Sequence, residues 1–400
     1  MRQKKRLTPV NYIYLLFVLG ICIMFLSLIC SKGSFLNKMV YDFSYFADFF
    51  DHIRRFYLGL DSVYAEGMHA CFPPLAYCIY YLISRMLYYN NIDNPQELSY
   101  SGSGLLIICL FTALLAIFFV FVFLRLCRLP DKLGKRVLAV LLFASYPFWL
   151  AVERGNLSFL VLILLMYAMD LKDSGSGAQR EVALVLFAIA AALKLYPAIF
   201  GIFYIAEKRY KEAVRLVFYG CLFFFLPFAF FHGMDGFFLF LRNITAVNSG
   251  ATGVTIVGIV GRIGDRLGLS LTTGPAIGKI ISYFYFLFVI VACFKNKIYW
   301  KKVSFVTSLM IIFVAASGTY CLVYWVIPFA CFLNYLHTKT QFTAMDYVYA
   351  TLFSLTFIAY PISIAGSSGM LYMSLYTLLG LLIIEQLLEV LKKLCNSMVI

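Results

Sequence analysis

The sequence predicts an all-α, polytopic integral membrane protein with about 12 transmembrane segments, and two observations lead to this fold class. The 400 residues are 63% hydrophobic and 13% charged, whereas soluble domains average about 45–50% apolar and about 25% charged residues. Apolar runs alternate with short polar or basic segments along the whole chain. We therefore expect a single multi-span membrane domain over residues 1–400 rather than a soluble core.

The net charge of +14 does not indicate nucleic-acid binding, because the basic residues stand in short clusters between apolar runs. This pattern follows the positive-inside rule. The basic residues 1–10 precede an apolar run without a small-residue cleavage site, so we expect a retained first span. Together with Lys392 and Lys393 near the other end, they predict a multi-pass protein of the cell membrane with both termini cytoplasmic.

No metal or other cofactor is expected. The eleven cysteines form no CxxC pair and most lie inside apolar runs, so we interpret them as small apolar side chains rather than disulfide or zinc partners. The acidic residues of the first loop are not joined by a further carboxylate or histidine cluster with the spacing of metal ligands.

The first span is residues 11–30, and the loop that follows, residues 31–103, is expected to be external. Residues 45–57 predict an amphipathic helix lying on the membrane surface. Its expected apolar side is Phe46, Phe49, Phe50, Ile53, Phe56 and Tyr57, and its expected polar side is Asp48, Asp51, His52 and Arg55.

Residues 75–87 leave two topologies open, because the segment is short and Arg85 interrupts it. If it spans the membrane, the basic cluster at residues 125–136 is external, against the positive-inside rule. If it lies in the interface, residues 105–124 cross inward and the cluster is cytoplasmic. We favour the interfacial position.

Four apolar segments after this cluster are shorter than the roughly twenty helical residues that a bilayer crossing needs. They are Val137–Val152, Leu157–Met169, Val182–Leu193 and Ala198–Ala206. We expect two half-buried hairpins with polar tips on the external side, at residues 153–156 and 194–197. Such interrupted hairpins are tolerated where they line a cavity, and they indicate a binding site.

Apolar and polar segments continue to alternate along the rest of the chain. Residues 214–231 are expected to cross outward to a second external loop, residues 232–274, which is rich in glycine. The remaining crossings are expected at residues 280–294, 303–316, 322–336, 347–362 and 370–391.

The carboxylates of the first external loop are the first candidate site. Asp42, Asp48 and Asp51 lie between a span and the predicted surface helix. A loop aspartate commonly serves as a cap or salt-bridge partner, but one held as a general base could deprotonate a hydroxyl nucleophile. We interpret Asp61 and Glu66 as surface residues.

The first hairpin tip carries Glu153 and Arg154 beside Asn156. Two charges at the end of a short span are costly unless they face water or each other. The simpler interpretation is a Glu–Arg pair that ends one helix, with Asn156 capping the next.

The second tip carries Lys194 at the end of an apolar helix, and Tyr196-Pro197 breaks that helix. A snorkelling lysine is the simpler interpretation, but such lysines favour the cytoplasmic side. A cation near the outer interface suits a lipid-linked phosphate. Arg242, among other arginines expected on this face, could share that role.

The order of these features resembles the GT-C superfamily of polytopic glycosyltransferases, which use lipid-phosphate sugar donors. Within it the sequence is most similar to glycosyltransferase family 87, the polyprenyl-phosphate-mannose-dependent mannosyltransferases. The resemblance covers roughly residues 11–336. The stretches that carry it are Phe72-Pro73-Pro74-Leu75, Arg154-Gly155-Asn156 and Ala190–Pro197, with a looser match at Ser317–Pro328.

The resemblance implies an inverting transfer of a mannose-like hexose from a polyprenyl-phosphate donor to a glycan or glycolipid acceptor on the extracytoplasmic face. It implies a general base in the first external loop, either Asp48 or Asp42, of which we prefer Asp48. Lys194 and Arg154 are the implied phosphate contacts. The further candidate substrate contacts are Asn156, Glu153, Tyr196, Asp51 and Arg242.

Two other functions stay open from the residues alone. A polysaccharide polymerase would be expected to carry its basic site in a large loop between later spans. A transporter or flippase for lipid-linked sugars usually has inverted repeats and ionisable residues at mid-membrane, and neither is visible.

Overall fold

The computed structural model describes residues 7–39, 46–56, 59–65, 70–87, 95–247, 254–314, 317–358 and 369–398. Within these residues the chain is helical and has no strand, which confirms the predicted all-α fold class. The predicted candidate Asp42 lies outside the described residues.

The helices follow one another through the whole described chain. In order they are α1 (Pro9–Cys30), α2 (Leu36–Met39), α3 (Ala47–Arg54), η1 (Leu60–Ser62), α4 (Pro74–Ser84), α5 (Pro95–Tyr100), α6 (Gly102–Leu126), α7 (Lys132–Phe143), α8 (Tyr146–Arg154), α9 (Ser158–Leu171), α10 (Gly177–Leu193), η2 (Tyr196–Gly201), α11 (Ile202–Ala206), α12 (Tyr210–Phe225), η3 (Leu226–Phe230), α13 (Met234–Val247), α14 (Ile256–Arg266), α15 (Thr273–Lys295), α16 (Tyr299–Ser308), η4 (Leu309–Phe313), η5 (Thr319–Trp325), α17 (Val326–Thr338), α18 (Ala344–Ile358) and α19 (Gly369–Met398).

Six helical stretches of the described chain are long and apolar enough to cross a membrane. They are α1, α6, α12 with η3, α15, η5 with α17, and α19. Helices α7 and α8 are bent by 55° at their junction and would make a seventh span if counted together. The protein is therefore multi-pass, as predicted. The remaining predicted segments fall on shorter helices, namely α9, α10, η2 with α11, α16 with η4, and α18. Residues 75–87, which we expected in the interface, fall on α4.

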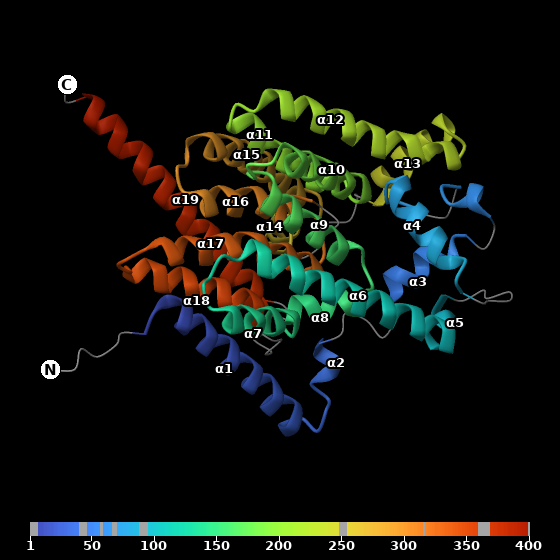
Figure 1. Cartoon of the computed structure of the whole chain (residues 1–400), viewed down its shortest axis with the longest axis horizontal. Helices are drawn as coiled ribbons and strands as arrows, with labels where there is room; N and C mark the ends of the chain where they lie inside the picture. Colours follow the sequence, from blue (N-terminus) through green and yellow to red (C-terminus); the bar gives the residue numbers. More distant parts are fainter. Residues whose placement is uncertain are drawn as a thin grey trace.

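Three of the first-loop helices gather at one end of the molecule. In Figure 1, α3, α4 and α5 lie on the right, opposite the start of α1 and the end of α19 on the left. The predicted surface helix forms as α3, and its apolar residues Phe49, Phe50 and Ile53 are fully buried. They pack against α4, α5 and α8 rather than facing outward. His52 and Arg55 are buried as well, so neither lies on an exposed polar side, although the sequence placed both on the polar side of the helix.

The two predicted hairpins are present. The first runs through α7 and α8 to a tip at Gly155 and returns in α9, while the second runs through α10 to Lys194 and returns in η2 and α11. Both tips follow sequence rules, because a left-handed glycine ends α8 and Pro197 stands in the first turn of η2. Helix α10 packs against both α9 and α12.

Candidate active site at the hairpin tips

The first hairpin tip fixes the position of α3. Gly155 adopts a left-handed conformation with φ 62°, and a Cβ atom there would lie 2.6 Å from Cβ of Phe49. The backbone N–H of Phe46 donates to the carbonyl of Glu153 at 2.7 Å. Because glycine alone permits this approach, the start of α3 rests directly on the end of α8.

This contact brings the Asp48 carboxylate to the residues on either side of Gly155. Arg154 donates a charge-assisted hydrogen bond to Oδ1 of Asp48. Nδ2 of Asn156 donates to Oδ2 of the same carboxylate at 2.7 Å. The structure therefore joins three of the predicted site residues, although Asp48 is more than a hundred positions away in sequence.

Hydrogen bonds continue from Asn156 to the second hairpin tip. Oδ1 of Asn156 accepts from the backbone N–H of Ser158 at 2.9 Å and from its hydroxyl at 2.8 Å. Nζ of Lys194 donates to Oγ of Ser158 at 2.9 Å. Arg154, Asp48, Asn156, Ser158 and Lys194 thus form one connected set, which we call the polar chain.

The ammonium group of Lys194 is a buried cation. The residue is 5% exposed, and aromatic rings surround Nζ at 5.0 Å for Phe72, 5.7 Å for Tyr196 and 5.4 Å for Tyr320. Within the described part of the chain, no carboxylate lies within ion-pair distance of it. Burial lowers the pKa of Lys194 from its ordinary value. An anion bound beside it would stabilise the charged form.

A cavity of about 420 Å³, which we call the Lys194 cavity, lies against this ammonium group. Its polar part is formed by residues near Lys194, and the hydroxyl of Tyr196 lies 2.9 Å from that of Tyr324. Its apolar part includes Phe286 of α15 and the π-helical turn η4. The lining residues are Cys71, Phe72, Pro73, Lys194, Leu195, Tyr196, Ile199, Ile244, Phe286, Leu309, Phe313, Val314, Ser317, Tyr320 and Cys321. A cavity lined by both a cation and apolar side chains suits an amphiphilic anion.

The other predicted site residues lie elsewhere. Asp51 pairs with Arg54 at 3.0 Å and with Arg55 at 2.7 Å, on its own helix. Glu153 is buried, and its carbonyl anchors the start of α3. Arg242 is exposed on α13. None of these belongs to the polar chain as the structure describes it.

Ser158 is a central residue that sequence reasoning missed. It is fully buried and joins the two hairpin tips. The sequence could have indicated Ser158, because an asparagine side chain commonly forms a local turn by hydrogen bonding to the residue two positions further on. Phe72 and Tyr320 lie in two of the stretches that carry the family resemblance, but their approach to Lys194 could not be predicted, because they reach it from distant segments.

The fold and the site define a multi-span membrane protein whose buried polar residues meet beside an amphiphilic cavity. Comparison with known proteins agrees with this class, because the family model of glycosyltransferase family 87 matches residues 95–318. That is more than half of the 400-residue chain, and the chain belongs to glycosyltransferase family 87. It is a membrane glycosyltransferase, as the resemblance predicted. No curated protein and no solved structure matches the chain.

Proposed function

We propose that the protein transfers a mannose-like hexose from a polyprenyl-phosphate donor to a glycan or glycolipid acceptor on the extracytoplasmic face. One observation carries this proposal: Lys194, a buried cation without an acidic partner among the described residues, faces an amphiphilic cavity and is hydrogen-bonded through to Asp48. A lipid-linked phosphate is an anion attached to hydrocarbon, so it matches both the cation and the apolar side chains that line the cavity. Family membership favours this function over a transporter or flippase.

In the proposed reaction Asp48 is the general base. Each of its oxygens accepts one hydrogen bond, from Arg154 or from Asn156, and each keeps a second lone pair. The charge-assisted hydrogen bond from Arg154 helps to hold the carboxylate in position. Asp48 takes the proton of the acceptor hydroxyl as that oxygen attacks the anomeric carbon.

The bond from the anomeric carbon to the phosphate oxygen breaks in the same step, and polyprenyl phosphate leaves with the bonding electrons. Attack from the opposite side inverts the anomeric centre. Lys194 holds the phosphate and stabilises the negative charge that develops on the leaving group. No group is oxidised or reduced, so the reaction needs no redox partner.

The test is transfer of labelled sugar by the purified protein in lipid vesicles. We expect transfer from a polyprenyl-phosphate hexose to a membrane glycan or glycolipid fraction, and none from the matching nucleotide sugar. Transfer from the nucleotide sugar alone would overturn the proposed donor class. A product that keeps the donor's anomeric configuration would overturn the inverting mechanism.

The proposed orientation has its own test. Single cysteines at Tyr100 and Pro130, in a variant whose native cysteines are replaced, are treated with a membrane-impermeant maleimide in intact cells. We expect labelling at Tyr100→Cys and protection at Pro130→Cys, because the latter lies in the basic segment expected to be cytoplasmic. Labelling of Pro130→Cys from outside would refute this topology.

A further inference from the structure

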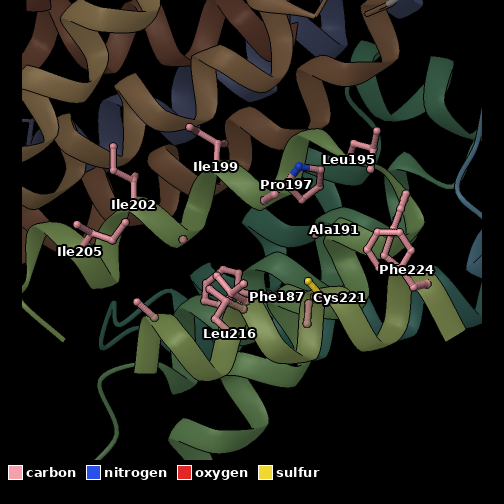
Figure 2. Close-up of a pocket in the computed structure, with 17 residues that line it drawn as sticks. Phe187, Ala191, Leu195, Pro197, Ile199, Ile202, Ile205, Leu216, Cys221 and Phe224 are labelled. Carbon is pink, nitrogen blue, oxygen red and sulfur yellow. The ribbon is translucent and has the colours of Figure 1, made fainter. Parts of the chain in front are cut away.

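A second hollow of about 510 Å³ lies on the other side of the Lys194 tip, between α10, η2, α11 and α12, and we call it the α10–α12 pocket. Figure 2 shows side chains of the η2–α11 segment along one wall and side chains of α12 along the other. Small residues leave the space open. They are Ala188, Ala191, Ala198, Gly201, Ala213 and Gly220.

The lining of the α10–α12 pocket is suited to a hydrocarbon chain. Every residue that lines it is apolar, from Phe187 on α10 to Phe225 on α12. Helix α12 begins a candidate membrane span, and no residue of α12 is buried inside the protein, so most of its surface is open to lipid. The α12 wall runs from Ala213 to Phe225, about 18 Å at 1.5 Å per residue. That length is close to one leaflet of a hydrocarbon core about 30 Å thick.

The two hollows share a wall. Leu195 and Ile199 line both of them, whereas Lys194 and Tyr196 line the Lys194 cavity alone. The second hairpin tip therefore separates two apolar spaces, which share Leu195 and Ile199 next to the polar residues of the tip. Lipids that occupied both spaces would lie on either side of η2, with their headgroups near the polar chain.

The Lys194 cavity has room for the hydrocarbon chain of the donor. Phe286, Leu309 and Phe313 form an apolar part within the same hollow as the Lys194 ammonium group. A lipid phosphate with its headgroup at Lys194 thus has room for the adjoining hydrocarbon there. The α10–α12 pocket is left for a second chain, and the second substrate of a transferase is its acceptor.

We propose that the α10–α12 pocket binds the hydrocarbon chain of the acceptor, and hence that the acceptor is a lipid-linked glycan or glycolipid rather than a free glycan. This inference rests on the proposed function above, which supplies the donor at Lys194. The chain in the pocket would hold the acceptor headgroup at the Leu195 end, beside the polar chain that contains Asp48.

The test measures binding and does not depend on sugar transfer. Two photoreactive probes are used in nanodiscs: a dialkyl glucoside with a diazirine in its chain, and polyprenyl phosphate with a diazirine near its headgroup. We expect saturable glucoside labelling on α10 and α12, and polyprenyl phosphate labelling on α15 and η4. Excess unlabelled polyprenyl phosphate should leave the glucoside labelling unchanged.

Two glycine-to-leucine variants form a matched pair, because only one of them would fill the α10–α12 pocket. A Cβ at Gly220 meets no atom within 4 Å, and the same holds for Gly380 on α19. Gly220→Leu should reduce glucoside labelling at least tenfold without changing polyprenyl phosphate labelling, whereas Gly380→Leu should change neither. If Gly220→Leu fails to fold, Ala191→Phe on the opposite wall fills the same space.

Three results would overturn the inference. They are glucoside labelling that does not saturate, labelling that survives both filled-pocket variants, and displacement of the glucoside by polyprenyl phosphate. The last would mean that one donor chain occupies both hollows. Failure of the proposed function looks different: polyprenyl phosphate labelling would not saturate, or Lys194→Gln would leave it unchanged, whatever the glucoside does.

Discussion

The side-chain amide of Asn156 lies 2.7 Å from the Asp48 carboxylate and donates to it across 108 positions of sequence. The other end of that amide accepts two hydrogen bonds from Ser158, so its orientation is fixed. The bond connects the first loop to the hairpin tips. It makes the acid and the cation of the site parts of one hydrogen-bonded structure.

Replacement of the proposed base is the first prediction. Asp48→Asn keeps the shape of the side chain but removes its capacity to accept a proton, so we expect the rate of sugar transfer to fall about 10²- to 10⁴-fold. The measurement is initial rate at saturating donor, with the melting temperature as a check on folding. Asp42→Asn should keep most of the activity.

The matched control for Asp48 is Asp170→Asn. Asp170 also pairs with an arginine, Arg125 at 2.8 Å, but away from the polar chain. The Asp170→Asn variant should lose no more than about twofold in the rate of sugar transfer, since a partly exposed ion pair contributes at most about 1 kcal/mol. Full activity in Asp48→Asn together with inactivity in Asp42→Asn would move the base to Asp42.

Ser158 should act as a positioning residue. Ser158→Ala removes the hydroxyl that joins Asn156 to Lys194, and a lost hydrogen bond of about 0.5–1.5 kcal/mol predicts a KM for the donor raised about two- to tenfold. The control is Ser304→Ala, a buried serine whose hydroxyl donates to the carbonyl of Trp300 on its own helix. An equal change in KM in both variants would argue against the assigned role.

Two buried lysines should respond in opposite ways to the same substitution. Lys172 is 1% exposed and pairs with Glu207 at 2.8 Å, whereas Lys194 has no such partner in the described residues. Lys172→Gln removes the nearest cation from Glu207, which is partly exposed and keeps Arg209 at 3.4 Å, so we expect a loss of stability of about 1.5–3 kcal/mol, as for a lost hydrogen bond to a charged group. Lys194→Gln removes an uncompensated buried charge, so the melting temperature should hold or rise.

The two lysine variants should also differ in their KM for the donor. Lys194→Gln should raise the KM for the polyprenyl-phosphate donor about tenfold or more, as expected for a lost charge-assisted hydrogen bond of about 1.5–3 kcal/mol. Any folded Lys172→Gln protein should keep its donor KM. Lower stability and unchanged donor KM in Lys194→Gln would show that Lys194 is a structural residue.

The glycine at the first tip gives a prediction about stability and site assembly. Gly155→Ala places a methyl group 2.6 Å from Phe49, which must shift α3 and with it Asp48. Gly268→Ala is the control, because Gly268 has a similar φ of 74° but meets nothing within 4 Å. We expect both to lose about 1 kcal/mol from the left-handed backbone, and only Gly155→Ala to lose sugar transfer as well.

Much of this architecture was readable from sequence because membrane segments and hairpin tips are local features. The Gly155 turn and the Tyr196-Pro197 break follow from single residues with fixed backbone preferences. The pairing of Asp48 with Asn156 was not readable, since it depends on how α3 packs on α8. The same holds for His52, which helical spacing placed on a polar face and tertiary packing buried.

Burial of His52 makes the stability of the first loop depend on pH. Burial, followed by the nearby Arg55 cation, lowers the pKa of His52 from 6.5 to about 3, against the opposing pull of Asp48 and Asp51. Lys194 acts in the same direction as Arg55. The folded protein therefore keeps this ring neutral, whereas the unfolded chain takes up a proton below its ordinary pKa of 6.5.

Stability is accordingly greatest above pH 6.5 and is lost as the pH falls from 6.5 toward 3, by up to about 1.4 kcal/mol per pH unit from this one group. The measurement is the melting temperature between pH 7.5 and about 4.5. His52→Phe keeps the ring packing on Phe72 and Tyr80 and gives up the hydrogen bond to Tyr77. We expect it to be less stable at pH 7.5 but to have a flatter pH dependence. The exposed His337→Phe should retain the slope of the parent protein, and an equal slope in all three proteins would show that another group carries it.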